Sequence, residues 1–173
     1  MGKLYLHSKI IEKISSYSSI TWVEIGVRFG FNSEYILNNF DVEKIYLIDP
    51  YCELPYRKDI FSKDQVQSYE RQAHKRLEKF KSKCTWFKDY SQNVCNKIDN
   101  ESIDILYIDG DHHYNAVSQD LSMYYPKVKK NGLIIGDDYN EIGVSNAIKD
   151  FSKTHNISFQ TSHDETSKFW FIK

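Results

Sequence analysis

The sequence predicts an α/β protein: a doubly wound, mostly parallel sheet of seven strands with helices on both faces and an antiparallel hairpin at its C-terminal end. Short runs rich in Ile, Val, Tyr and Trp alternate with segments in which apolar residues recur every three or four positions. Such alternation is typical of a parallel sheet with helical crossovers. The last two apolar runs are separated only by QTSHDETS, too short for a crossover helix, so they should pair antiparallel.

The strands are recognised by their apolar runs, and the central runs are continuously apolar, as expected for strands covered on both faces. Five strands are expected at 20–26, 44–49, 84–87, 104–109 and 132–137, and two more at 157–160 and 168–173, one of which should lie beside the fifth. Helices are expected from Asn32 and Ser33 through EYILNNF, at 64–81, near 114–125 and at 142–154.

Composition limits the class of protein. The 173 residues are enough for one domain, expected to span 1–173, and the net charge of -1 gives no field that would attract nucleic acid. No apolar run approaches the ~18 residues of a membrane-spanning helix. The three cysteines have no CxxC spacing, and the N-terminus lacks a signal-peptide pattern. We therefore expect a cytoplasmic protein that binds neither nucleic acid nor membrane.

A glycine loop follows the first strand. In VEIGVRFGFNS, Gly26 and Gly30 allow a tight turn and a close approach to a ligand, although glycines that merely form a turn would look the same. Arg28 stands where the dinucleotide pattern GxGxxG has its middle glycine. Glu24, at the end of the strand, is suited to orient an ammonium group. Asp49 ends the second strand, where an acid binds ribose hydroxyls or caps the loop before Pro50.

Acidic residues gather at the ends of the fourth and fifth strands. Asp109 ends one strand, and Asp137 with Asp138 ends the next. Because these ends face the same crevice, the three carboxylates should converge and require a cation or ligand to neutralise them. Oxygen ligands suit Mg²⁺ or another hard divalent cation. The alternative is that these acids cap helices and pair with Lys or Arg.

Two adjacent histidines follow Asp109. His112 is predicted to be the general base for a substrate hydroxyl, because its ordinary pKa lies near neutrality and it stays closer to the strand end than His113. His113 should begin the next helix. The sequence by itself leaves His113 open as a substitute.

Four segments together resemble the class I S-adenosylmethionine-dependent methyltransferases, which have a Rossmann-like fold, and within them the branch called methyltransferase domain 24. They are VEIGVRFGFNS, IYLIDPY, DILYIDGDHHYNAVSQDLSMYYPKVKKNGLIIGDDY and AIKDFSK with FWFIK. That branch is similar to metal-dependent macrolide-sugar O-methyltransferases. The resemblance covers the chain from about residue 20, and its specific part is IDGDHHY with GDDY.

The resemblance implies a set of site residues. S-adenosylmethionine would be bound by residues at the strand ends, its adenine by a segment after the third strand, and a metal by the acidic cluster, with His112 near the substrate. The cofactor residues are Glu24, Gly26, Gly30, Ser33, Asp49, Asp89, Tyr90, Ser91 and Asp109, and the metal ligands are Asp109, Asp137 and Asp138. The resemblance extends more distantly to catechol O-methyltransferases, which have Asp-Asn where this chain has Asp137-Asp138, so metal affinity should differ.

The expected reaction is metal-assisted methylation of a hydroxyl oxygen on a small molecule or sugar, with His112 and Asp109 at the catalytic centre. Three alternatives compete: a methyltransferase acting on nitrogen or nucleic acid, a nicotinamide-dependent dehydrogenase, and a silent cofactor-binding module. Asp-Pro-Tyr at 49–51 resembles the motif of amino-methylating enzymes but follows the wrong strand. The chain lacks the long N-terminal extension that would cover the substrate in the sugar-type relatives. We therefore expect a small acceptor, or a pocket completed by a second subunit in a homo-oligomer.

Overall fold

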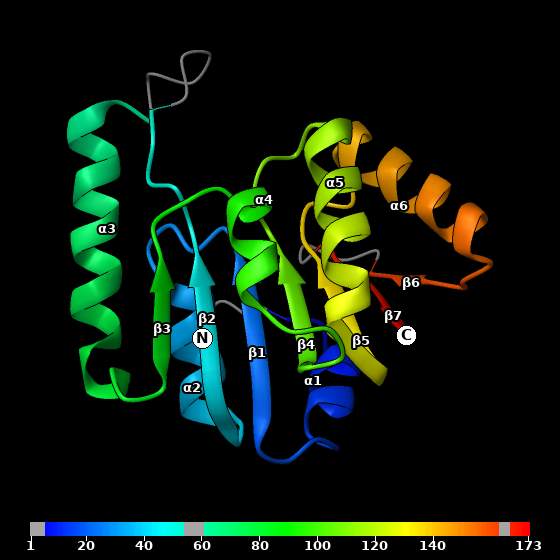
Figure 1. Ribbon diagram of the computed structural model, residues 1–173, viewed down its shortest axis with the longest axis horizontal. Coiled ribbons are helices and arrows are strands. Elements are labelled where there is room, and N and C mark those ends of the chain that lie inside the picture. Colours follow the sequence, from blue (N-terminus) through cyan, green and yellow to red (C-terminus); the bar gives the residue numbers. More distant parts are fainter. Residues whose placement is uncertain (1–5, 54–60, 163–166) are drawn as a thin grey trace.

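The computed structural model describes residues 6–53, 61–162 and 167–173, and over these residues it confirms the predicted architecture (Figure 1). The strands are β1 (Ile20–Ile25), β2 (Val42–Ile48), β3 (Cys84–Phe87), β4 (Ile103–Ile108), β5 (Val128–Gly136), β6 (Gln160–Thr161) and β7 (Phe169–Ile172). They form one sheet in the order β3-β2-β1-β4-β5-β7-β6. The first five strands are parallel, and β7 lies antiparallel between β5 and β6.

Helices cover both faces of this sheet. They are α1 (Ser8–Ile14), α2 (Phe31–Asn39), α3 (Lys63–Leu77), α4 (Ser91–Val94), α5 (Tyr114–Tyr124) and α6 (Ile142–His155), with 3₁₀ turns at Glu78–Phe80, Cys95–Lys97 and Tyr125–Lys127. Alternate strand residues supply two cores. Val23 and Leu106 pack with α4, α5 and α6, whereas Trp22 and Tyr107 pack with α1, α2 and α3. Both faces are thus buried, which explains the continuous apolar runs.

The structure differs from the sequence-based expectation at several elements, one of which is the short helix α4, where no helix was expected. Helix α1 was not expected, and it buries Ile10 and Ile14 against the sheet. Strand β5 begins at Val128 rather than at residue 132. Strand β6 is Gln160–Thr161 rather than 157–160, because Ile157 and Phe159 are apolar for packing against the core and not for pairing. Residues 163–166, which connect β6 to β7 in the sequence, lie outside the described residues.

The parallel pairing places the carboxyl ends of β1, β2, β3, β4 and β5 at one edge of the sheet. The loops that follow β1, β2, β3, β4 and β5 all leave from this edge (Figure 1). In open α/β sheets this edge is where ligands bind, and it contains every site residue predicted from the sequence. None of the helices in the described ranges is long and apolar enough to cross a membrane.

Candidate active site

The loop after β1 lies against the end of β4. Gly26 has a φ of +87°, and a Cβ atom on it would stand 1.9 Å from the backbone oxygen of Asp109. Only glycine permits this conformation together with this approach. Gly30, with a φ of +72°, is the N-cap residue of α2. The loop therefore brings the start of α2 to the crevice at the end of β4.

Glu24 is enclosed beneath this loop. Its side chain is buried, and the Ser33 hydroxyl donates a hydrogen bond to its Oε2 at 2.7 Å. Burial raises the pKa of Glu24 to about 8; the hydrogen bond from Ser33 opposes this rise, and the Asp109 carboxylate adds to it. This carboxyl is mostly neutral at pH 7, and a nearby positive charge would favour its ionised form.

Asn32 carries a polar group suited to a ligand. It lies close enough to Glu24 to lower the pKa of that carboxyl. Its amide nitrogen and oxygen are buried and reach no hydrogen-bond partner among the described residues. Leaving such a group unsatisfied costs ~1–3 kcal/mol. The amino-acid end of S-adenosylmethionine offers donors, acceptors and a positive charge. Asn32 and Glu24 together thus fit the cofactor that the resemblance implies.

Asp49 joins the end of β2 to the glycine loop. Its Oδ2 accepts the backbone N–H groups of Val27 at 2.9 Å and Arg28 at 2.8 Å, and its Oδ1 accepts that of Tyr51 at 2.8 Å. The loop-capping alternative is therefore present in the structure. Burial raises the pKa of Asp49, and the three hydrogen bonds oppose the rise. Of these bonds Oδ1 accepts one, so it retains capacity for a ribose hydroxyl.

The segment expected to hold adenine follows β3 at the same edge. The Asp89 carboxylate accepts hydrogen bonds from Asn93 Nδ2 and the Tyr90 backbone N–H, which lower its pKa. The Ser91 hydroxyl donates to Asp120 of α5, and burial raises the pKa of Asp120 to about 6. The side chain of Tyr90 is 50% exposed, so a planar ligand can reach its ring.

Asp109, His112 and Asp138 meet at the ends of β4 and β5. The His112 Nε2 atom lies 3.2 Å from Asp138 Oδ2 and 3.9 Å from Asp109 Oδ1. The Asp109 carboxylate beside the ring raises the pKa of His112, and the charge of Asp138 raises it further. Burial raises the pKa of Asp109. The three side chains are 32–42% exposed, so a substrate can reach the imidazole.

Asp138 also has a constrained backbone. Its φ of 51° lies in the left-handed region, which a short polar residue such as Asp tolerates better than most. Arg28 and Tyr51, on the neighbouring loops, have φ values of 50° and 44°. Residues away from this edge, such as Ser19, Glu101 and Asn131, also lie in the left-handed region, so these angles by themselves do not mark a functional site.

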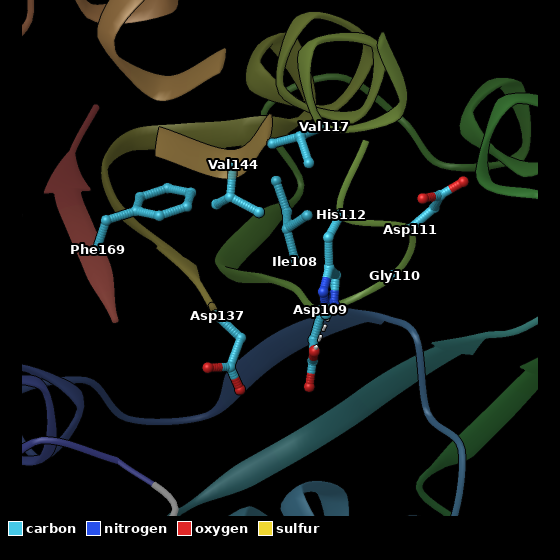
Figure 2. Close-up of a pocket in the computed structure, with 9 residues that line it drawn as sticks. All are labelled: Ile108, Asp109, Gly110, Asp111, His112, Val117, Asp137, Val144 and Phe169. Atoms are coloured by element: carbon cyan, nitrogen blue, oxygen red, sulfur yellow. Dashed lines mark ion pairs between the residues drawn. The ribbon is translucent and has the colours of Figure 1, made fainter. Parts of the chain in front are cut away.

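The two histidines have different surroundings. Figure 2 shows the His112 ring next to Asp109, whereas Asp111 turns away from both. His113 is the N-cap residue of α5, and its Nδ1 contacts the Asp111 carboxylate. The structure thus places His112, and not His113, at the meeting point of the strand ends.

A small pocket adjoins this histidine (Figure 2). Its acidic lining residues are Asp109, Asp111 and Asp137, of which Asp111 points away from the other two. Its apolar lining consists of Ile108, Val117, Val144 and Phe169. Its free volume is about 10 Å³, close to that of a single water molecule, so an acceptor would lie at its mouth beside His112 rather than inside it.

Asp137 does not join the other two carboxylates as a free ligand. Its Oδ2 accepts the Lys168 ammonium and the Tyr107 hydroxyl, the latter at 2.9 Å, and its Oδ1 accepts the Asp138 backbone N–H at 2.7 Å. The cation set predicted from the sequence, Asp109 with Asp137 and Asp138, therefore does not fit. Asp137 instead matches the alternative named in the sequence analysis, in which an acid at a strand end pairs with a lysine.

The sequence analysis missed three polar residues of this edge: Lys168, Asn32 and Asp120. Lys168 opens the apolar run of β7, and only the pairing of β7 with β5 brings it to Asp137. Asn32 was read only as part of the start of a helix. Asp120 lies within an otherwise ordinary helical segment, where an acid is usually solvated, so no local signal marked it.

Comparisons with known proteins identify the family and the fold of the chain. A family model described as a methyltransferase domain matches residues 23–139. A curated relative, uncharacterized protein R132 of Acanthamoeba polyphaga mimivirus, is 30% identical over 148 residues, which cover 79% of this chain and 61% of that protein. The chain thus spans about three fifths of the length of this relative.

Solved structures share the fold. The O-methyltransferase NovP is similar with a TM-score of 0.62 and 16% identity, covering 89% of this chain and 72% of that chain. An rRNA methylase from Streptococcus thermophilus has a TM-score of 0.67 and 10% identity, covering 99% of this chain and 96% of that one. At such low identity the likeness shows the architecture and does not identify an acceptor.

Proposed function

This chain belongs to the methyltransferase domain family of class I S-adenosylmethionine-dependent methyltransferases, and from that premise we propose that it transfers a methyl group from S-adenosylmethionine to a hydroxyl oxygen of a small molecule or sugar. The family supplies the donor. The acceptor class rests on the chain's own residues at the ends of β4 and β5, where a proton acceptor lies beside a small, partly apolar pocket.

The position of His112 carries the proposal. Its Nε2 lies between two carboxylates, 3.2 Å from Asp138 and 3.9 Å from Asp109, at the end of the crevice next to the glycine loop. Carboxylates so placed stabilise the imidazolium that forms when the ring accepts a proton. General base catalysis of this kind contributes ~10²–10⁴-fold to a rate.

The reaction balances around this histidine. The cofactor supplies a methyl group bonded to a positively charged sulfur, and the acceptor oxygen forms the new bond to that carbon while the carbon–sulfur bond breaks with its electrons left on sulfur. The hydroxyl proton passes to neutral His112. Solvent takes it afterwards, because the ring is 42% exposed.

Assistance by a divalent cation, also expected from the sequence, would need a different donor set. Asp109, His112 and Asp138 each offer a ligand atom, and these atoms lie within 4.8 Å of one another. A cation there would lower the pKa of an acceptor hydroxyl. It would also occupy the His112 nitrogen that serves as the base in our proposal. We therefore propose that His112 accepts the proton of the acceptor hydroxyl, and this role does not depend on a bound divalent cation.

Turnover with a panel of acceptors tests the function. The purified chain is incubated with S-adenosylmethionine and a sugar, a catechol, a primary amine or a structured RNA, and S-adenosylhomocysteine release is measured. We expect release with a hydroxyl acceptor and a new O-methyl signal in the product. Transfer only to the amine or to RNA would refute the oxygen assignment. Failure to bind S-adenosylhomocysteine in calorimetry would refute the cofactor as well.

A further inference from the structure

Lys168 is a buried lysine at the edge that contains the active site. Its side chain is only 6% exposed, and its ammonium contacts Asp137 Oδ2. A lysine is rarely buried to this degree unless its charge is paired. The fold forces the pairing: β5 and β7 are antiparallel with Gly136 opposite Phe169, so the next residues along, Asp137 and Lys168, face each other.

Several further contacts fix the position of Lys168. Its backbone N–H donates to the Ser162 hydroxyl at 2.7 Å, and its carbonyl accepts the Ser162 N–H at 2.8 Å. Beyond it, the Tyr139 N–H donates to the carbonyl of Ser167 at 2.8 Å. The ammonium also lies 5.7 Å from the centre of the Tyr107 ring, whose face attracts a cation. Lys168 is therefore held at the strand end and is not a mobile surface residue.

The contacts of Asp137 leave little room for a metal ion. Lys168 and the Tyr107 hydroxyl both donate to Oδ2, and the Asp138 backbone N–H donates to Oδ1. A metal ion at Asp137 would have to displace donors that are covalently part of the chain. It would also stand next to a fixed positive charge, and like charges a few ångströms apart repel strongly where water is excluded.

Charge balance at the strand ends leads to the same conclusion. Three carboxylates at adjacent strand ends need positive charge nearby. Within the described part of the chain, the Lys168 ammonium lies against Asp137, and the His112 ring lies between Asp109 and Asp138, where it becomes positively charged when it accepts the acceptor's proton. The chain itself therefore provides the compensation that the sequence pattern had suggested would come from a metal.

We propose that Lys168 is a specificity-determining residue that takes the place of a divalent cation at Asp137, so that this site transfers methyl groups without a metal. Lys168 acts through Asp137 and is a positioning residue for the strand ends. The inference rests on the proposed function for the reaction it modifies, but its prediction about metal binding stands independently of any acceptor.

Manganese binding measures this role directly. Mn²⁺ is titrated, with electron paramagnetic resonance as the readout, into the full chain and into Lys168→Met, Asp137→Asn and the double variant with both changes. Lys129→Met is the matched control, because Lys129 pairs with Asp104 at 2.8 Å in a second lysine–aspartate pair involving β4 and β5. Each variant is also checked for folding by circular dichroism.

The pattern across the variants decides the matter. We expect Asp137→Asn to bind Mn²⁺ as the unchanged chain does, because Asp137 is no ligand. Lys168→Met should bind it on the order of tenfold or more tightly, as the freed carboxylate joins Asp109 and Asp138. The double variant should lose that gain, and Lys129→Met should show none. A merely structural lysine would not produce a gain that depends on Asp137.

Three results would overturn the inference. They are weaker Mn²⁺ binding in Asp137→Asn, no gain in a folded Lys168→Met, or loss of turnover when the unchanged chain is treated with a chelator. If Lys168→Met does not fold, Asp137→Asn still decides whether Asp137 binds the ion. If no acceptor is methylated, the proposed function fails while the manganese titration remains interpretable.

Discussion

The backbone oxygen of His112 lies 2.2 Å from the point at which a side chain on Gly143 would begin. Gly143 is in the first turn of α6, and the backbone nitrogen of Tyr114 is 2.9 Å from the same point. Helix α6 therefore packs directly on the backbone that leads from the end of β4 into α5. The position of the His112 ring depends on a residue that has no side chain.

Gly143→Ala should impair turnover without touching the substrate. The added methyl group must push the His112 backbone or α6 aside, because neither contact atom belongs to a flexible side chain. A displacement of about 1 Å of a reacting group can cost on the order of 10²-fold in rate. We expect a loss of that order in turnover and nearly unchanged affinity for S-adenosylhomocysteine, measured by calorimetry.

Asn146→Ala is the matched control for this change, since Asn146 is exposed on the same helix. It should leave turnover within about twofold of the unchanged chain. Normal turnover in a folded Gly143→Ala protein would show that α6 yields to the methyl group and does not hold the histidine loop.

Alanine variants of the two histidines separate the base from the helix cap. His112→Ala removes the imidazole between Asp109 and Asp138, and turnover should fall by roughly 10²-fold or more. His113→Ala removes the contact with Asp111 at the start of α5. It should lower thermal stability and affect turnover far less.

Both histidine variants are compared at saturating S-adenosylmethionine, with cofactor affinity measured separately. A greater loss of turnover in His113→Ala would assign the proton to His113. If both variants keep full turnover, neither histidine accepts the proton, and the acceptor must ionise by other means.

The sequence was sufficient to find the five parallel strands and the helices α2, α3, α5 and α6, because burial on both faces gives the central strands continuous apolar runs. It was insufficient where an element has few buried residues. Helix α1 has seven residues, of which Ile10 and Ile14 are buried, and so short a pattern resembles a loop. Strand β6 has two residues and takes its place from pairing with β7 rather than from its own side chains.

The candidate site was predictable as far as chain topology determines it. Parallel strands bring their ends together, so the approach of His112 to Asp109 and Asp138 followed from their places after β4 and β5. The partner of Asp137 could not be predicted in this way. Lys168 meets it through an antiparallel register, and a shift of one residue in that register would place Lys168 on the opposite face.

Asp49→Ala should weaken both the fold and cofactor binding. The change removes the acceptor of three backbone N–H groups, and one hydrogen bond to a charged group is worth ~1.5–3 kcal/mol. The free energy of unfolding, measured with urea, should fall by at least about that amount. Affinity for S-adenosylhomocysteine should fall by a similar free energy if Asp49 also binds the ribose.

A cofactor analogue separates these two effects. An S-adenosylhomocysteine analogue that lacks the ribose hydroxyls should bind Asp49→Ala and the unchanged chain with similar affinity. If the variant loses as much affinity for the analogue as for S-adenosylhomocysteine, Asp49 shapes the loop and makes no contact with ribose.

The buried carboxyl of Glu24 should make stability depend on pH. Its pKa is about 8 in the folded chain and 4.5 is its ordinary value. Between these values the folded chain retains a proton that the unfolded chain has lost, so raising the pH favours unfolding. This group should lower the free energy of unfolding by roughly 1.4 kcal/mol per pH unit across the window. Its stabilising contribution is complete below pH 4.5 and lost above pH 8.

Glu24→Gln removes this dependence, because glutamine keeps a polar group beside Ser33 without titrating. Urea unfolding of both proteins at pH 5.5 and pH 7.5 measures it. We expect the stability of Glu24→Gln relative to the unchanged chain to rise between the two pH values. Glu12→Gln, at an exposed position on α1, is the control and should show no such rise. Equal pH dependence in Glu24→Gln and the unchanged chain would mean that Glu24 is already ionised in the folded protein, with a positive charge or solvent beside it.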